Sequence, residues 1–310
     1  MAKRYPLPSP LFDTLENLAE SLNQGIDVQL DFAQDNLKHA FEFLKQYDGN
    51  ESTFKCYRRE IERLVQWSWL VQEKSILDLK RDDIEAYINF CMKPPRSWIA
   101  LKVVSRFRTI NGIRTPNRNW RPFVIQHKTN EILNKDHYKF SQKSIREIFV
   151  ALGSFYTFLN GENIIDYNPV SSIKQKSKFV RKTQTKSAVR RLTDLQWNTV
   201  VNTAKDLALL LPEKYERTLF IISALYLMYL RVSELVETSR WSPQMNHFHQ
   251  DIYQNWWFKT VGKGNKERDI AVNDDMLSAL SRWRLYLHLS PLPSIDENSP
   301  LIPKLRGHGN

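Results

Sequence analysis

The alternation of apolar and polar residues predicts helices over most of the first half of the chain. Apolar side chains recur every three or four positions, the period of one helix face, in the ranges 11–22, 31–47, 52–71, 84–92 and 144–159. Asp82 or Asp83 is the expected N-cap of the fourth helix, and Gly161 is expected to end the fifth. The first domain is therefore predicted to be all-α.

The second half changes from helical patterns to strand patterns and back. Helices are predicted at 194–206 and from 213 to 237. Residues 252–261 are rich in aromatic and β-branched side chains, which favours a strand. The glycines of 262–265 predict a tight turn into a return strand at 266–272, and a helix follows at 274–289. This order of elements predicts an α+β domain.

Two stretches interrupt these patterns. Residues 93–130 are rich in Pro, Asn and Arg, and residues 166–191 are polar and basic, as expected of a tether between domains. The predicted organisation is an N-terminal arm at 1–30, a helical domain at 31–165 with a basic insertion at 93–130, a linker at 166–191 and a second domain at 192–310. The chain is long enough for two domains, each with its own core.

The positive charge of the chain is concentrated in two segments. The formal net charge is +11, with 45 Lys and Arg residues against 34 acidic ones. Nine of the basic residues lie in 93–128 and eight in 167–193, and neither segment contains an acidic residue. This distribution predicts a polyanionic partner such as a nucleic acid. Trp98 and Trp120 either stack on that partner or pin a long loop to the core.

Other classes of protein fit the sequence less well. The longest apolar run, 219–230, is too short to span a bilayer, and the basic segments have no apolar helix face for a membrane surface. The N-terminus has no secretory signal, and Cys56 and Cys91 are expected to be reduced thiols of a cytoplasmic protein. His247, His249 and Asp251 have no further ligand cluster around them, so neither a metal site nor another cofactor is predicted.

Two short segments of the second half carry candidate chemistry. Arg231 follows the apolar run, so we expect a partly buried guanidinium that needs an anionic partner. Glu234 has the spacing to pair with it on a helix, and a structural ion pair at a helix end is the simpler interpretation. Lys263 lies between two glycines of the predicted turn, which is either a solvated loop or a backbone that approaches a ligand.

Together the two segments resemble a known family. Tyr-Leu-Arg-Val-Ser-Glu-Leu at 229–235 and Val-Gly-Lys-Gly-Asn-Lys-Glu-Arg at 261–268 are similar to two active-site motifs of the tyrosine recombinases, the family of the phage integrases and the Xer-like site-specific recombinases. Tyr229 stands where the family prefers a small residue. The resemblance covers roughly 31–290. It implies a mostly α, two-domain protein: a helical, SAM-like core-binding domain, then a partial α+β catalytic domain with a β-hairpin.

The resemblance also implies an activity and roles for residues. Members of this family clamp double-stranded DNA, self-associate on it as dimers to tetramers, and break and rejoin strands through a phosphotyrosine without metal or nucleotide. Arg231 is expected to bind the scissile phosphate, Glu234 to orient Arg231, and Lys263 to protonate the leaving 5′ oxygen. Lys266 and Arg268 are expected to hold flanking phosphates. Further DNA contacts are expected from Lys55, Arg58, Arg59, Arg106, Arg108, Lys143, Arg146, Lys178, Arg181 and Lys182.

The family's second arginine box and its nucleophilic tyrosine have no match before Asn310. We therefore expect a C-terminally incomplete chain that is inactive by itself and that comes from a mobile element or a related recombination system. The alternative is a non-catalytic DNA-binding protein or regulator derived from a recombinase. An RNA-binding helical protein is a more remote possibility.

Overall fold

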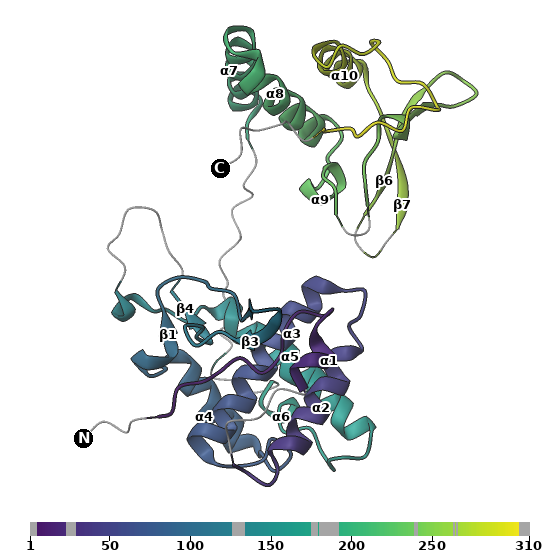
Figure 1. Ribbon diagram of the computed structural model, residues 1–310. Helices are drawn as coiled ribbons and strands as arrows, with labels where there is room; N and C mark the ends of the chain where they lie inside the picture. Colours follow the sequence, from purple (N-terminus) through teal and green to yellow (C-terminus); the bar gives the residue numbers. More distant parts are fainter. Residues whose placement is uncertain are drawn as a thin grey trace. The chain divides into compact units, whose positions relative to one another are not determined.

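The computed structural model describes residues 5–22, 29–125, 134–174, 179, 192–238, 241–262, 264 and 266–303. The chain forms two compact units, Met1–Thr185 and Lys186–Asn310 (Figure 1). Each unit has its own hydrophobic core. In the described parts of both, every helix is too short or too polar to cross a bilayer.

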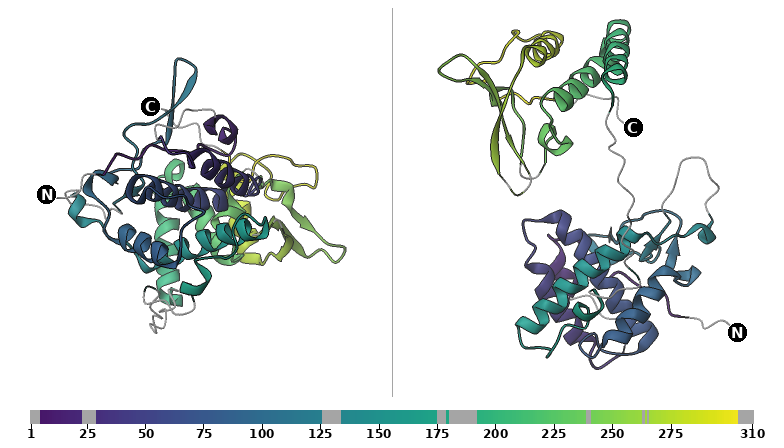
Figure 2. Two further views of the ribbon diagram at one scale, coloured as in Figure 1. Left: turned by 90° about the horizontal axis from the view of Figure 1, so that it is seen from below. Right: turned by 180° about the vertical axis from the view of Figure 1, so that it is seen from behind.

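Helices dominate the first unit. They are α1 (Leu18–Leu22), α2 (Ala33–Lys45), α3 (Glu51–Trp67), α4 (Arg81–Met92), α5 (Gln142–Gly161) and α6 (Ser171–Lys174). Helices α2, α3 and α5 contact one another and lie side by side (Figure 2). Their shared core is strongly aromatic, because Phe43, Phe54 and Phe155 are all buried in it. The predicted periodicity is therefore explained by one face of each helix turning to a common core.

The helix ends follow local chemistry. The Asn50 side chain accepts a hydrogen bond from the Thr53 N–H and caps α3, which continues into a π-helical turn at Ser68–Gln72. The prediction that Asp82 or Asp83 caps α4 was wrong, because Lys80 is the N-cap residue. The Asp83 carboxylate instead lies in the first turn, where it accepts a hydrogen bond from the Lys80 N–H at 2.7 Å.

The predicted insertion contains β-structure, so the expectation of an all-α first domain was wrong. Strand β1 (Ile99–Ala100) pairs in parallel with β4 (Phe123–Val124), and β2 (Phe107–Ile110) forms an antiparallel hairpin with β3 (Ile113–Pro116). Trp98 and Trp120 are buried, and the Trp98 indole donates to the Pro6 carbonyl at 2.9 Å. Both indole rings therefore anchor this segment to the core.

The segments that flank the predicted first domain also pack against it. Phe12 and Leu18 of the predicted arm are buried in the core of the first unit. Val170, Ile173 and Phe179, from the predicted linker, are buried in the same core. The described part of that linker is thus attached to the first unit.

The second unit combines helices with one small sheet. It contains α7 (Asp194–Leu210), α8 (Pro212–Leu227), α9 (Val232–Leu235), β5 (Phe248–Gln250), β6 (Trp256–Val261), β7 (Glu267–Ala271) and α10 (Asp274–Tyr286). The sheet is antiparallel in the order β5-β6-β7, with Phe258 of β6 between Phe248 and Ile270. Phe258 and Trp283 of α10 are buried in the core, which fixes the sheet against the helices.

The predicted helix from 213 to 237 is broken, and the break forms the candidate site. Helix α8 ends at Leu227, and Tyr229 adopts a left-handed conformation with φ of 51°. Arg231 is extended and precedes the short helix α9, whose Glu234 carboxylate accepts a hydrogen bond from the Arg231 N–H at 2.8 Å. This local bond replaces the continuing helical ladder.

Candidate functional site

One buried carboxylate organises the candidate site. Glu234 is 1% exposed. Its Oε2 accepts hydrogen bonds from the Arg231 N–H and from Arg268 Nη2, both at 2.8 Å. Its Oε1 accepts from Arg231 Nη1 at 3.0 Å. Glu234 therefore holds two guanidinium groups from α9's N-terminus and from β7 in a fixed relation to each other.

The cluster carries a net positive charge towards solvent. Burial opposes ionisation of Glu234, but the Arg231 N–H and the charge of Arg268 outweigh it and bring the pKa of Glu234 below its ordinary value of 4.5. One carboxylate thus balances one of two guanidinium charges. The side chains of Arg231 and Arg268 are 63% and 45% exposed. The expectation of a partly buried Arg231 was wrong, because it is Glu234 that is buried.

The turn of the β6–β7 hairpin lies against this carboxylate. The Gly262 N–H donates to the Lys266 carbonyl at 2.8 Å and closes the turn. A Cβ added at Gly262 would lie 3.1 Å from Glu234 Oε1, so only glycine lets the backbone approach this closely. Gly264 has φ of +81° in open space. Lys263 lies outside the described residues, between these two glycines.

Two aromatic side chains, Trp241 and His247, lie next to the backbone of Glu234. The Trp241 indole donates to the Glu234 carbonyl at 3.0 Å, and its ring stacks on the His247 ring at 4.5 Å. His247 Nδ1 accepts a hydrogen bond from the Gln244 N–H at 2.9 Å, and burial, with the nearby charge of Lys259, lowers the pKa of His247. His247 therefore packs against Trp241, and its lowered pKa favours the neutral imidazole.

Asp251 organises the loop that joins β5 to β6. Its carboxylate accepts hydrogen bonds from the N–H groups of Tyr253 and Asn255 and from the Trp257 indole. These bonds, led by that of Trp257, lower the pKa of Asp251 to about 2. Within the residues that the structure describes, no group of three or more His, Cys, Asp or Glu side chains is placed to hold a metal ion.

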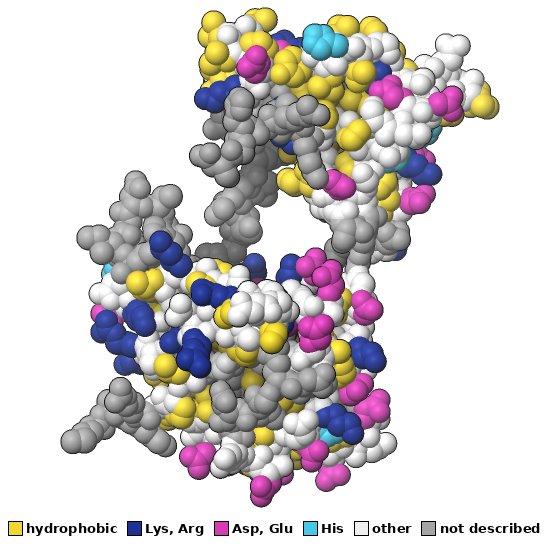
Figure 3. Space-filling model, viewed as in Figure 1, with side chains coloured by type: hydrophobic (Ala, Val, Ile, Leu, Met, Phe, Trp, Pro, Cys, Tyr) yellow, Lys and Arg dark blue, Asp and Glu magenta, His cyan; other side chains and the backbone are white. Residues whose placement is uncertain are grey.

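The residues that were predicted to contact DNA lie in different environments. Lys55, Arg108, Lys143, Arg146 and Lys266 are exposed. Of these, Lys55 pairs with Glu51 and Lys143 with Glu147 at the surface. Three further predicted contacts have less exposed side chains and protein partners: Arg58 donates to the Asp13 carbonyl, Arg59 pairs with Glu60 and Glu147, and Arg106 pairs with Glu62. Lys178, Arg181 and Lys182 lie outside the described residues. In the first unit, Lys and Arg side chains gather over the part formed by β1 and β4 (Figure 3).

Sequence reasoning placed Arg231 and Glu234 together but missed the link from Arg268 to the same carboxylate. Arg268 was predicted only as a contact to flanking phosphates. Glu234 and Arg268 are 34 positions apart, and helical spacing cannot relate positions that far apart. The one signal available was the hairpin itself, which brings the start of β7 back beside Gly262.

Comparisons with known proteins give two kinds of likeness. No family model matches the sequence. Over 215 residues, 69% of this chain, the sequence is 26% identical to the tyrosine recombinase XerD of Rickettsia bellii (strain RML369-C). The aligned part spans 59% of that relative's length.

Among solved structures, the chain is similar to the XerH site-specific recombinase. The match to XerH bound to palindromic difH substrate, a post-cleavage complex, has a TM-score of 0.52 at 12% identity and covers 98% of this chain and 77% of that chain. XerH bound to difH substrate in a pre-cleavage complex gives 0.48 at 12% identity, covering 98% and 78%. At this identity the first match shows a similar fold.

Proposed function

We propose that the chain is part of a site-specific recombinase of the tyrosine recombinase family, which binds duplex DNA and breaks and rejoins its strands through a phosphotyrosine intermediate. The likeness to XerD, together with the two motifs at 229–235 and 261–268, supports the family's activity. We extend the proposal to self-association on DNA and to a cytoplasmic setting.

The observation that carries the proposal is the pair of guanidinium groups on Glu234. A phosphodiester has two non-bridging oxygens, and planar guanidinium groups bind such oxygens in fixed directions. Arg231 and Arg268 are oriented by the buried carboxylate before any ligand arrives, and most of Arg231 is exposed. Cations held in advance stabilise the extra negative charge of a pentacoordinate phosphorus. In this proposal Arg231 contacts the scissile phosphate and Glu234 positions it.

Lys263 supplies the second chemical role. An oxygen that leaves phosphorus needs a proton, and a lysine whose pKa its surroundings can tune is able to donate one. Gly262, the residue before Lys263, lets the hairpin approach the Arg231–Glu234 pair closely. We assign to Lys263 the protonation of the 5′ oxygen.

The test uses nicked suicide duplexes, on which a cleaved strand stays attached to the protein. The 310-residue chain by itself should yield no denaturation-resistant adduct. In a chain that also carries the family's second arginine box and tyrosine, Arg231→Ala and Lys263→Ala should both lose cleavage and keep most DNA affinity.

A sulfur at the 5′ leaving position separates the two roles. A thiolate leaves without a proton, so this substrate should rescue Lys263→Ala and should not rescue Arg231→Ala. Equal rescue of both variants, or rescue of neither, would remove the separate roles. If Arg231→Ala unfolds the second unit, the structural ion pair with Glu234 is the better interpretation.

The second candidate function is a DNA-binding protein that does not cut. The exposed cations support binding equally well in that case. Persistent absence of adduct from a chain that includes every family motif, with intact DNA binding, would favour it.

A further inference from the structure

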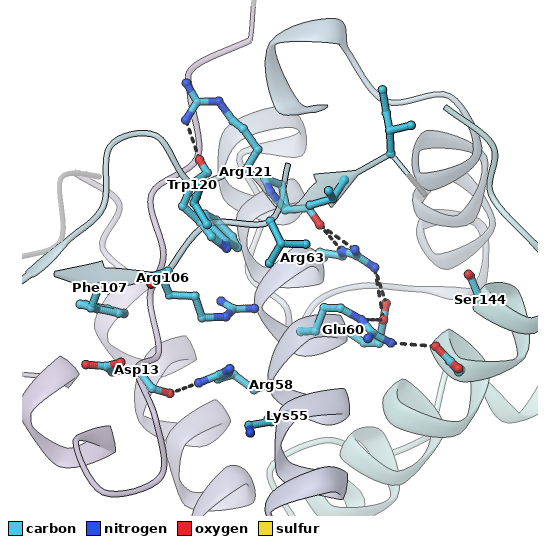
Figure 4. A pocket seen from close by; sticks show the side chains of 18 of the residues that line it. Asp13, Lys55, Arg58, Glu60, Arg63, Arg106, Phe107, Trp120, Arg121 and Ser144 are labelled. Atoms are coloured by element: carbon cyan, nitrogen blue, oxygen red, sulfur yellow. Dashed lines mark hydrogen bonds and ion pairs between the residues drawn. The ribbon is translucent and has the colours of Figure 1, made fainter. Parts of the chain in front are cut away.

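The first unit contains a basic pocket, whereas the candidate site belongs to the second unit. The pocket has a volume of about 790 Å³ and lies between α3 and the segment that carries β2, β3 and β4 (Figure 4). Its lining includes the basic side chains of Lys55, Arg58, Arg59, Arg63, Arg106 and Arg121. Acidic groups line it as well, among them Asp13, Glu60 and Glu147.

Some of these cations already have hydrogen-bond or ion-pair partners within the protein. Arg63 donates twice to the Pro122 carbonyl, at 2.6 and 2.8 Å, and also pairs with Glu60. Arg59 pairs with Glu60 and Glu147. Arg121 donates to the carbonyls of Ser97 and Arg118. Arg63 thereby ties the segment to α3, and Arg59 ties α3 to α5. The charges of all three side chains are already compensated or directed at carbonyl groups.

Arg58 is different, because among the described residues no carboxylate lies within ion-pair distance of its buried guanidinium. It is 8% exposed, its Nη1 donates to the Asp13 carbonyl, and its Nε is buried with no hydrogen-bond acceptor among the described residues. The side chains of Arg106, Arg58 and Lys55 lie one below the other in the pocket (Figure 4). Burial, and then the charge of Arg106, lower the pKa of Arg58 to about 10.

Arg106 is held so that it faces this space. Its guanidinium lies over the Trp120 ring at 4.8 Å and pairs with the buried Glu62. Glu62 also accepts the N–H groups of Leu11 and Phe12, so its charge is shared among several donors. Arg58, Arg106 and Lys55 thus converge on the pocket, where Arg106 pairs with the buried Glu62 and Lys55 forms an exposed ion pair with Glu51 at 2.6 Å. An uncompensated buried charge is costly unless an anion joins it.

We propose that Arg58, Arg106 and Lys55 form a binding site for a phosphate group. A phosphate offers several acceptor oxygens and up to two negative charges, which suits two guanidinium groups and an ammonium better than a single carboxylate does. The source is either a backbone phosphate of DNA, in which case the proposal rests on the proposed function, or a free phosphorylated anion. The experiment separates the two.

The first arm needs no DNA. Inorganic phosphate is titrated at constant ionic strength against chloride, and the melting temperature of the first unit is followed by near-UV circular dichroism. At ten times the dissociation constant the wild-type chain should gain about 3–6 °C over chloride. Arg58→Met keeps the packing and removes the charge, so it should lose this gain. Its melting temperature in chloride should equal or exceed that of the wild type.

Two further variants, Lys55→Met and Arg81→Met, test the proposal if Arg58→Met does not fold. Lys55 is 56% exposed, so Lys55→Met should fold and should weaken phosphate binding about three- to tenfold. Arg81 on α4 lies outside the pocket and is 53% exposed, so Arg81→Met removes a charge elsewhere and should leave the phosphate gain unchanged. The proposal would be overturned if phosphate raised the melting temperature equally in the wild type and in Arg58→Met or Lys55→Met. It would also be overturned if phosphate did not raise the melting temperature of the wild type.

The second arm uses duplex DNA. If a backbone phosphate occupies the pocket, Lys55→Met should reduce the slope of log affinity against log salt by up to about 0.9, because the exposed pair of Lys55 with Glu51 is weak and lets the ammonium contact a phosphate. Inorganic phosphate should then compete with DNA. If phosphate raises the melting temperature of the wild-type chain but Lys55→Met has the same slope of log DNA affinity against log salt as the wild type, the ligand is a free anion. A wild-type chain that binds phosphate but no duplex at all would contradict the proposed function and leave the pocket intact.

Discussion

At the scale of single residues, Glu234 has the largest predicted effect. We expect Glu234→Gln to lower the free energy of unfolding of the second unit by about 1–3 kcal/mol, because a buried acceptor of three hydrogen bonds loses its charge and gains donors that face guanidinium groups. Urea denaturation measures the change. Glu267→Gln is the matched control, because Glu267 is 65% exposed in its pair with Lys259 and should change stability little.

The same residue predicts a pH dependence. The pKa of Glu234 is lower in the folded chain than its ordinary 4.5, so its ionisation stabilises the fold above about that pH. The stability is lost as pH falls through the lowered folded pKa. The difference in unfolding free energy between wild type and Glu234→Gln should therefore be constant near neutrality and shrink on acidification below pH 4.5. A difference that grows in acid would contradict this sign.

Tyr229 stands where the recombinase motif that the sequence resembles prefers a small residue, and the backbone explains that preference. Its φ of 51° lies in the left-handed region, where a side chain costs about 1–2 kcal/mol and glycine costs little. Tyr229 is 83% exposed, so little packing is lost on substitution. We expect Tyr229→Gly to leave the melting temperature of the second unit equal or higher, and Tyr229→Val to lower it. A lower melting temperature for the glycine variant would show that the tyrosine ring itself stabilises the site.

At the scale of elements, the two glycines of the β6–β7 hairpin should separate site geometry from strand stability. Gly262→Ala places a Cβ 3.1 Å from Glu234 Oε1, so the carboxylate must shift by a few tenths of an ångström and its hydrogen bonds to the guanidinium groups change. Gly264→Ala meets nothing within 4 Å, and its positive φ makes the turn itself less stable. We expect both variants to lose about 1 kcal/mol or more.

The discriminating measurement is the environment of Arg231 and Arg268, followed by the NMR signals of their side-chain Nε–H groups. These signals should shift in Gly262→Ala and stay in place in Gly264→Ala. Shifts of equal size in both variants would mean that the turn acts on the site only through its stability.

Elements were predictable where periodicity and local caps agree. Helices α2, α3, α5 and α10 have one apolar face. The capping side chains of Asn50, Ser141 and Asn273 mark the starts of α3, α5 and α10. The break after α8 was not predictable. The same apolar sequence pattern is compatible with a continuous helix and with a helix that ends where Tyr229 adopts a left-handed conformation. Strands of two to four residues in 99–124 are too short to show alternation.

The candidate site was predictable only as far as local spacing reaches. Arg231 and Glu234 are three positions apart, and that spacing gave their pairing. Arg268 reaches Glu234 through the return strand of the hairpin, which is a tertiary contact. The burial of Trp98 and Trp120 also depends on tertiary packing, since the sequence alone allowed either a stacking or an anchoring role.

At the scale of the whole molecule, the count of basic residues overstates the charge that is free to meet a polyanion. Within 93–125, Arg96, Arg106 and Arg114 already pair with Asp136, Glu62 and Asp13. The exposed cations of the first unit, such as Arg108 and Arg146, keep their charge towards solvent. The net charge of +11 therefore sets attraction at a distance, and a smaller set of side chains sets the number of phosphate contacts.

This distinction gives the last prediction. The chain should bind duplex DNA with an affinity that falls steeply with salt, by about tenfold between 50 and 200 mM for every two phosphates neutralised, because each contact releases counterions. Replacing Arg181 and Lys182 together by Ala should weaken binding to all sequences alike and flatten the slope by up to about 1.8, since backbone contacts carry no base information.

Arg114→Ala is the informative comparison for this last prediction, because it removes the same type of charge from a residue that donates to Asp13 at 2.7 and 2.8 Å. It should leave the slope almost unchanged, since the Asp13 carboxylate already neutralises Arg114. Fluorescence anisotropy on two unrelated duplexes across a salt series measures both effects. An affinity that does not change with salt, or a loss confined to one duplex, would contradict a backbone role for the basic segments.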